Sequence, residues 1–358
     1  MTQDCARNIA HLFESDRIAG NFSTVDRLFP TSEIASPEPS PALPKGQIQR
    51  LPNAVLQWIE TQWVTSFLVL KDGALIHESA HRGTQPEDRR MSWSIAKSFL
   101  SVLFGILRGE GMFPSLDVSA TEYAPALKGS AYDGVTLEHL LQMTSGVAFD
   151  EDYHDPASDI RRLADYLGRG GGLDAYMAAR QKRHAAPGAV WVYNSLDTQA
   201  LGMVIRGATG RDTPDLLSEK LITPLGCEAA PGYLTDARGV AFVLGGLTMR
   251  ARDYARFGQM MADRGRWQGR QIVPRDWTDR VDHGLAPTPE GELGYGDQWW
   301  RPADAVPGEF MACGIYGQYI YVNRAARTVC VTTSANRRFS EEGVFENALD
   351  IFRQIAAL

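Results

Sequence analysis

The sequence predicts an α+β protein in which an antiparallel sheet is flanked by helices and interrupted by an inserted all-helical part. Hairpin patterns lie near both ends of the folded chain, at residues 67–78 and 316–333, whereas helical patterns fill the middle. The hairpin connections are too short for the crossovers that parallel strands require, which favours an antiparallel sheet. The two ends of the chain must therefore share one sheet.

Composition restricts the classes of protein to which the chain can belong. Its 358 residues include 36 Lys and Arg against 43 Asp and Glu, a formal charge of −7, and 44% are hydrophobic. This apolar fraction excludes a disordered chain, and the acidic balance argues against general nucleic-acid binding. No apolar run reaches the roughly 18 residues of a membrane span. We therefore expect neither nucleic acid nor a membrane as a partner.

The cysteines and the first residues indicate a cytoplasmic protein. The cysteines are too few and too scattered for a disulfide framework and form no C-x-x-C pair; they are Cys5, Cys227, Cys313 and Cys330. The N-terminal residues lack the basic and apolar regions of a secretory signal. Reduced thiols without a signal favour the cytoplasm.

The first elements follow from prolines, an apolar stripe and a turn pair. Residues 1–47 are predicted to form a separate extended arm, because four prolines fall within residues 36–44. The next segment has the apolar stripe of a short helix, made by Val55, Leu56, Ile59 and Trp63. The pair Asp72-Gly73 between apolar runs then predicts the hairpin over residues 67–78.

Helical patterns and a second hairpin follow. One helix begins at Ser94 and reaches residue 107, and another, over residues 136–144, is capped by Thr136. Further helices are expected over residues 196–205, 216–225, 249–264 and 347–357. Residues 150–185 are polar and rich in glycine, with a flexible loop expected at residues 168–172. Apolar runs at 316–322 and 329–333 flank a polar turn and predict the second hairpin.

These elements divide the folded chain into two domains. We expect residues 48–130 and 240–358 to build one discontinuous sheet domain. Residues 131–239 are expected to form a mostly helical domain inserted into it.

The stretch from His77 to His81 matches the zinc-protease pattern H-E-x-x-H. That chemistry needs a helix, in which residues four apart lie one turn from each other on the same face. Here the stretch continues a strand, where four residues span roughly 13 Å. We therefore expect sheet residues here, and neither a metal nor another cofactor in the protein.

The pattern Ser94-Ile95-Ala96-Lys97 places a hydroxyl in the first turn of a helix and an amine three residues later on the same face. A serine becomes a nucleophile when a neighbour takes its proton, and a buried lysine can do so because burial lowers its pKa. The helix N-terminus also stabilises negative charge on the attacking oxygen.

Tyr193 supports the same interpretation. The segment Tyr193-Asn194-Ser195 lies on a loop that enters a predicted helix. A tyrosine there can hydrogen-bond to both the serine and the lysine, and it can pass a proton to a leaving group. On its own it would be interpreted as a core tyrosine beside a helix cap.

These motifs occur in the order found in class C β-lactamase-like serine hydrolases, and the chain resembles that family over residues 50–358. The matching segments are Ser94 to Lys97, residues 140–146, Tyr193 to Ser195 and residues 314–319. The family includes the family VIII carboxylesterases and the 6-aminohexanoate-dimer hydrolases. Residues 150–158, 252–258 and 314–322 look most like the second branch.

The resemblance implies a β-lactamase/transpeptidase-like fold and a role for each matching residue. Ser94 resembles the acylated nucleophile, Lys97 its activating partner and Tyr193 the proton shuttle. The oxyanion hole would be the backbone N–H of Ser94 and a second N–H from an edge strand near Ile315. Tyr153 resembles a lid tyrosine that contacts the scissile amide.

Two departures from the family pattern affect the substrate. The strand motif Lys-Thr-Gly of β-lactamases is replaced by Ala312-Cys313-Gly314, and Ser195 stands where class C enzymes carry Asn. Losing the cation removes a charge-assisted contact with the substrate carboxylate, which weakens the β-lactam interpretation. Either of two later arginines, Arg337 or Arg338, can substitute for it.

The prediction is a serine hydrolase, a carboxylesterase or amidase, that cleaves esters and linear ω-amino-acid amides through an acyl-enzyme. We expect Tyr153, Ser195, Gly314 and Tyr316 to contact the substrate, a small molecule. The acidic loop at residues 150–155 can attract a substrate ammonium. The alternatives are a β-lactamase or D-amino-acid peptidase, and a catalytically silent binding protein. A homodimer is left open.

Overall fold

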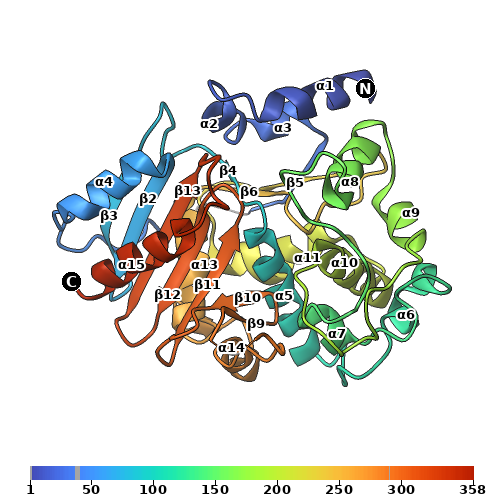
Figure 1. Cartoon of the computed structure of the whole chain (residues 1–358). Coiled ribbons are helices and arrows are strands. Elements are labelled where there is room, and N and C mark those ends of the chain that lie inside the picture. Colours follow the sequence, from blue (N-terminus) through green and yellow to red (C-terminus); the bar gives the residue numbers. More distant parts are fainter. Residues whose placement is uncertain (1, 37–40, 290) are drawn as a thin grey trace.

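A seven-stranded sheet runs through the described part of the chain, which comprises residues 2–36, 41–289 and 291–358 of the computed structural model. Its strand order is β3-β2-β13-β12-β11-β10-β9, and every neighbouring pair is antiparallel. The strands are β2 (Val64–Lys71), β3 (Ala74–Ala80), β9 (Gly294–Gly296), β10 (Trp299–Arg301), β11 (Glu309–Gly314), β12 (Gln318–Asn323) and β13 (Thr328–Ser334). Strands from before and after the helical middle region therefore share one sheet, and the predicted α+β class is confirmed (Figure 1).

Both predicted hairpins are confirmed. Asp72 and Gly73 join β2 to β3 with positive φ angles of 53° and 76°, as a tight turn of the hairpin type requires. The second hairpin joins β12 to β13, and β13 in turn pairs with β2. Residues 64–71 and 328–334 thus lie side by side as the second and third strands of the sheet (Figure 1).

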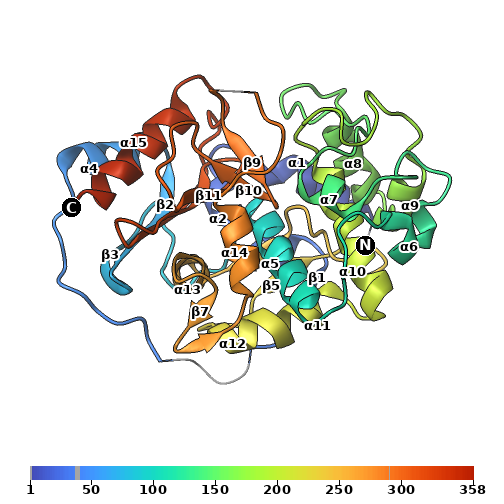
Figure 2. The same cartoon turned by 90° about the horizontal axis from the view of Figure 1, so that it is seen from below.

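Helices cover both faces of the sheet because β2 sends apolar side chains to each. Leu68 and Leu70 pack in the cluster that contains α5 (Ile95–Gly109) and α13 (Ala251–Ala262). The alternate residues, Phe67 and Val69, pack with α4 (Asn53–Thr61) and α15 (Val344–Ala356). Figure 2 shows these two helix pairs on opposite sides of the sheet.

Shorter elements complete the fold. The helices of the middle region are α6 (Ala120–Tyr123), α7 (Leu137–Leu141), α8 (Asp159–Gly168), α9 (Leu173–Ala178), α10 (Ser195–Thr209), α11 (Thr213–Leu217) and α12 (Thr223–Leu225). A second sheet joins β1 (Thr31–Glu33), β5 (Gly232–Leu234), β6 (Leu247–Met249) and β4 (Arg90–Met91). Beyond α13 lie β7 (Arg266–Trp267), β8 (Arg270–Gln271) and α14 (Arg275–Val281).

The prediction of an extended arm over residues 1–47 is wrong for its first part. This part folds into α1 (Thr2–Leu12), α2 (Ile18–Asn21), α3 (Val25–Leu28) and β1. The prolines that suggested an arm occur only from residue 37 onward, and residues 37–40 lie outside the described residues. Before them, buried apolar side chains such as Leu12, Ile18 and Phe22 pack against Met91 and hold the segment on the protein.

The polar segment 150–185 is more ordered than predicted, since it contains α8 and α9. The Ser158 hydroxyl caps α8 by accepting from the Arg161 N–H. Ile160 and Leu163, three residues apart, bury the inner face of this helix. This apolar stripe is short and lies among polar residues, so the sequence pattern did not predict the helix.

The strand prediction for the H-E-x-x-H stretch is confirmed, because β3 extends through residue 80. The ring nitrogens Nε2 of His77 and His81 lie 3.0 and 2.9 Å from the Ser79 hydroxyl. Across the described residues, no group of three or more His, Cys, Asp or Glu side chains is arranged to hold a metal. The same residues include no helix that is long and apolar enough to cross a membrane. The division into two domains stays a prediction.

Candidate active site

Ser94 lies at the N-cap of α5, where the chain turns from β4 into a buried helix. Trp93, the residue before it, has a φ of 47°. A bulky residue rarely adopts this left-handed conformation, and such strain is concentrated at functional sites. The turn presents the Ser94 hydroxyl at the end of the helix rather than inside it.

Lys97 points back at Ser94 from the first turn of α5. Its Nζ donates to Ser94 Oγ at 2.8 Å and to the Leu244 carbonyl at 2.7 Å, and the residue is 1% exposed. Burial lowers the pKa of Lys97 to about 8, while the nearby Glu151 carboxylate acts in the opposite direction. A minor but substantial fraction of the amine is therefore neutral near physiological pH, and a neutral amine can accept the proton of a serine hydroxyl.

Tyr193 lies next to the pair formed by Ser94 and Lys97. It precedes α10, whose first turn is fixed by the Asn194 side chain accepting from the Leu196 N–H at 3.0 Å. The Tyr193 ring centroid lies 5.3 Å from Lys97 Nζ, and the ring stacks on Trp300. Burial raises the pKa of Tyr193, against the effect of a hydrogen bond with Ser94. The phenol is therefore protonated and can donate to a neighbouring atom.

The end of β11 closes against the N-terminus of α5. A Cβ atom on Gly314 would lie 2.7 Å from the Ser92 carbonyl oxygen and 3.1 Å from the Ser94 nitrogen, so only glycine allows this approach. Ile315 and Tyr316 follow directly, and Tyr316 turns the chain with a φ of 64°. Backbone groups of the strand end and of Ser94 thus lie side by side.

The strand that leads to Ile315 is not an edge strand, contrary to the prediction. β10 and β9 extend the sheet beyond β11. Each of these two strands has three residues, too few for an alternating pattern to be recognised in the sequence.

A cavity of about 220 Å³ opens beside Ser94. It is mainly apolar, and the residues that line it are Ile9, Phe13, Trp93, Ser94, Tyr153, Pro156, Ile160, Arg161, Ala164, Asp165, Leu167, Phe242, Leu244, Gly245, Ile315 and Tyr316. Among the predicted substrate contacts, Tyr153 and Tyr316 lie on its wall. Ser195 and Gly314 do not line it. Ser195 is fully buried, and its backbone N–H donates to Glu151.

The Glu151 carboxylate joins the site, although sequence reasoning placed this residue only in an acidic loop. It accepts from Ser195 N and, at 3.4 Å, from the Tyr153 hydroxyl. Burial raises the pKa of Glu151, and the charge of Lys97 opposes this rise. No sequence signal distinguishes Glu151 from Asp150 and Asp152, since the inward direction of its side chain is a tertiary property.

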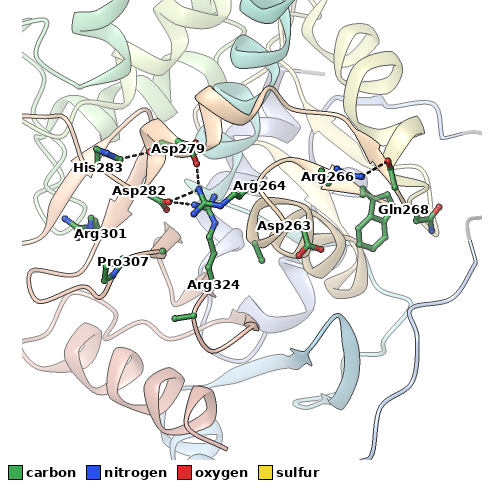
Figure 3. Close-up of a pocket in the computed structure, with 15 residues that line it drawn as sticks. Asp263, Arg264, Arg266, Gln268, Asp279, Asp282, His283, Arg301, Pro307 and Arg324 are labelled. Atoms are coloured by element: carbon green, nitrogen blue, oxygen red, sulfur yellow. Dashed lines mark hydrogen bonds and ion pairs between the residues drawn. The ribbon is translucent and has the colours of Figure 1, made fainter.

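A larger hollow, of about 1470 Å³, lies near α14 and the β7–β8 turn (Figure 3). Its central arginines are already paired, Arg264 with Asp279 and Arg324 with Asp282. None of the described residues that line it carries a hydroxyl, a thiol or a lysine amine. Of these two hollows, the cavity beside Ser94 is therefore the one that holds a serine hydroxyl next to a lysine amine.

Fold and site together define a serine hydrolase of β-lactamase-like architecture. A sequence model of the family described as Beta-lactamase matches residues 57–354. A relative from Paenarthrobacter ureafaciens, named 6-aminohexanoate-dimer hydrolase, is 31% identical over 88% of this chain and 84% of its own. The chain belongs to the beta-lactamase family.

Solved structures show the same fold. A Bacillus anthracis structure named as a candidate 6-aminohexanoate-dimer hydrolase superposes with a TM-score of 0.86 at 24% identity, over 96% of this chain and 95% of its own. A family VIII carboxylesterase superposes with a TM-score of 0.64 at 15% identity, over 87% of this chain and 99% of its own. The predicted family and fold are thus confirmed.

Proposed function

We propose that the enzyme works through an acyl-enzyme formed on Ser94. The single observation that carries the proposal is the 2.8 Å contact between Ser94 Oγ and the buried amine of Lys97. Neutral Lys97 takes the hydroxyl proton as Oγ forms a bond to the substrate carbonyl carbon. Tyr193, whose ring centroid lies 5.3 Å from Lys97 Nζ, gives its proton to the leaving alcohol or amine and recovers a proton from Lys97.

The tetrahedral oxyanion is held by the backbone N–H groups of Ser94 and Ile315 in this proposal. The close approach at Gly314 supports the pairing, since it brings the strand end to the Ser94 nitrogen. One such donor is typically worth about 10²–10³ in rate. Water then attacks the acyl group, with the same lysine and tyrosine accepting its proton, and Ser94 is released.

We infer that the substrates are esters and linear amides of the ω-amino-acid type. The Paenarthrobacter relative acts, by its name, on a 6-aminohexanoate dimer, and the cavity beside Ser94 is mainly apolar. The position of the β-lactamase strand cation is occupied by Ala312, which disfavours substrates that need a charged anchor there. Of the two arginines named as substitutes, Arg338 is paired with Glu341.

The first experiment tests the nucleophile. A fluorophosphonate should add once to the parent enzyme and not to Ser94→Ala, as read by intact mass. Ser101→Ala is the matched control, because Ser101 is a buried serine of the same helix whose hydroxyl has no partner among the described residues. An unlabelled parent would contradict the proposal and favour a silent binding protein. Equal labelling of Ser94→Ala would contradict it by showing that another residue is the reactive nucleophile.

A substrate panel separates the enzymatic alternatives. We expect turnover of a p-nitrophenyl ester and of an aminohexanoate dimer, with esters faster because their leaving groups need less protonation. Rapid turnover of a chromogenic cephalosporin, or of a D-amino-acid peptide, would replace this proposal with the β-lactamase or peptidase alternative. A cytoplasmic location and a homodimer stay predictions.

A further inference from the structure

The N-terminal segment, defined here as residues 2–29, forms one wall of the cavity beside Ser94. Ile9 of α1 and Phe13, which follows α1, both line that cavity. Figures 1 and 2 both show α1 next to α8, whose residues Ile160 and Leu167 line the same cavity. The cavity is thus enclosed by two helices that lie about 150 residues apart in the chain.

Phe13 contacts the two residues that flank the catalytic atoms. Its ring stacks on Trp93, with centroids 6.0 Å apart, and on Tyr316, with centroids 5.6 Å apart. Trp93 directly precedes Ser94, and Tyr316 directly follows Ile315. Phe22 supports the same pair edge-on, at 5.3 and 5.2 Å. The segment is therefore fixed against the site by aromatic packing.

The cavity is assigned to the acyl part of the substrate in the proposed reaction. Tyr193, which protonates the leaving group in that mechanism, does not line it. Its walls are apolar at Ile160, Leu244 and Ile315, and at 220 Å³ it is below the roughly 300–1,000 Å³ of drug-sized sites. Such a space suits a short, linear aliphatic chain.

We infer that the N-terminal segment sets the length of acyl chain that the enzyme accepts, with Phe13 as the limiting wall. This inference rests on the proposed function. The family model matches this chain only from residue 57 onward, so the N-terminal segment lies outside the part that the model describes. The substrate class is therefore short linear aliphatic acyl esters and amides.

The test compares p-nitrophenyl acetate, butyrate, hexanoate and octanoate. Phe13→Ala should raise the octanoate-to-acetate ratio of kcat/KM by about tenfold or more. Removing the ring makes room for a few more methylene groups of the acyl chain, and each methylene that fits a pocket typically changes kcat/KM by about tenfold or more. Ile9→Trp should lower the same ratio by filling the cavity. Thermal unfolding of both variants checks that they are folded.

Phe29→Ala is the matched control. Phe29 is another partly buried phenylalanine of the N-terminal segment that packs in the same apolar cluster but does not line the cavity. We expect its chain-length profile to equal that of the parent. An equal loss on all four esters in Phe13→Ala, or an unchanged ratio in both Phe13→Ala and Ile9→Trp, would overturn the inference and leave Phe13 as mere support for Trp93 and Tyr316.

Failure of the underlying function has a different signature. If Ser94→Ala hydrolyses the esters as fast as the parent, the acyl-enzyme proposal fails, and the inference fails with it. If hydrolysis depends on Ser94 but the chain-length profile is the same in Phe13→Ala, Ile9→Trp and the parent, only the inference fails.

Discussion

Burying the Lys97 amine removes the hydration of its charge, and this loss lowers its pKa to about 8. The Glu151 carboxylate limits the effect, because a nearby negative charge favours the ammonium form. Burial also raises the pKa of Glu151 by disfavouring its anion, and the positive charge of Lys97 lowers that pKa again. Each group thus sets the protonation of the other, and the activity should depend on both.

Glu151→Gln should shift the pH profile of ester hydrolysis toward acid. In the parent, we expect kcat/KM to rise with pH around 8 as Lys97 loses its proton. Removing the carboxylate removes the charge that holds the proton on Lys97, so its pKa falls and the rise occurs roughly one pH unit lower. Rates measured from pH 5.5 to 10 locate the inflection.

Asp152→Asn is the control for that shift, because Asp152 is an exposed acid in the same loop whose carboxylate accepts backbone N–H groups of the loop itself. Its inflection should match that of the parent. An equal acid shift in both variants would mean that loop charge in general, rather than Glu151, acts on Lys97.

At the scale of elements, the contact between β11 and α5 positions the candidate oxyanion donors. Gly314→Ala would bring a Cβ to 2.7 Å from the Ser92 carbonyl oxygen, which forces the strand end away from Ser94. We expect kcat to fall by about 10²-fold or more, as for a lost oxyanion donor, and stability by about 1–3 kcal/mol from overpacking. Ester kinetics and urea unfolding measure the two effects.

Gly20→Ala controls for the cost of adding a methyl group. A Cβ on Gly20 meets no atom within 4 Å, so kcat should not change, and stability should stay equal or rise by up to about 1 kcal/mol because Gly20 lies in helix α2. Full activity in Gly314→Ala would show that the strand end does not hold a donor in place.

Elements with a strong local signal were predictable from the sequence. The turn pair Asp72-Gly73 and the long apolar face of α5 each determine their structure within a few residues. The three-residue strands β9 and β10 were not predictable, because they exist only through pairing with β11. Helices α1 and α8 were missed for a related reason, since each has a short apolar face that partners from distant segments cover.

At the scale of the whole molecule, Arg256 ties three distant segments together. This arginine on α13 is 0% exposed, and it bonds to Glu228 at 2.9 Å, Asp253 at 3.2 Å and the Pro41 carbonyl at 3.0 Å. Arg256→Met should lower the free energy of unfolding by about 3–5 kcal/mol, because it leaves the buried Asp253 carboxylate without its cation. Urea unfolding at pH 7 measures the loss.

Arg275→Met provides the comparison, since Arg275 is paired with Asp279 at 3.7 Å but its side chain is 70% exposed. Its loss should cost at most about 1 kcal/mol. Similar small losses in both variants would mean that the Arg256 cluster contributes no more than a surface pair.

The candidate site also contains residues that the sequence made predictable and residues that it did not. The order of the motifs around Ser94, Lys97 and Tyr193 made this trio recognisable, because their spacing along the chain carries the resemblance. Glu151 and Phe13 reach the site through tertiary packing alone, so no spacing or periodicity points to them. Sequence reasoning therefore identified the reacting groups. It missed Glu151, which affects the pKa of Lys97, and Phe13, which lines the cavity.

The pairing of β2 with β13 has a consequence for how the protein is made. The hydroxyls of Thr65 and Thr333 lie 2.9 Å apart, although 268 residues separate them in the chain. At about 5–20 residues per second, a ribosome takes roughly tens of seconds to deliver the second strand after the first. Until then the β2–β3 hairpin presents an open edge on which other chains can pair. The pairing of β2 with β13 therefore forms late in synthesis, and the exposed edge of β2 is open to aggregation until residues 328–334 have been made.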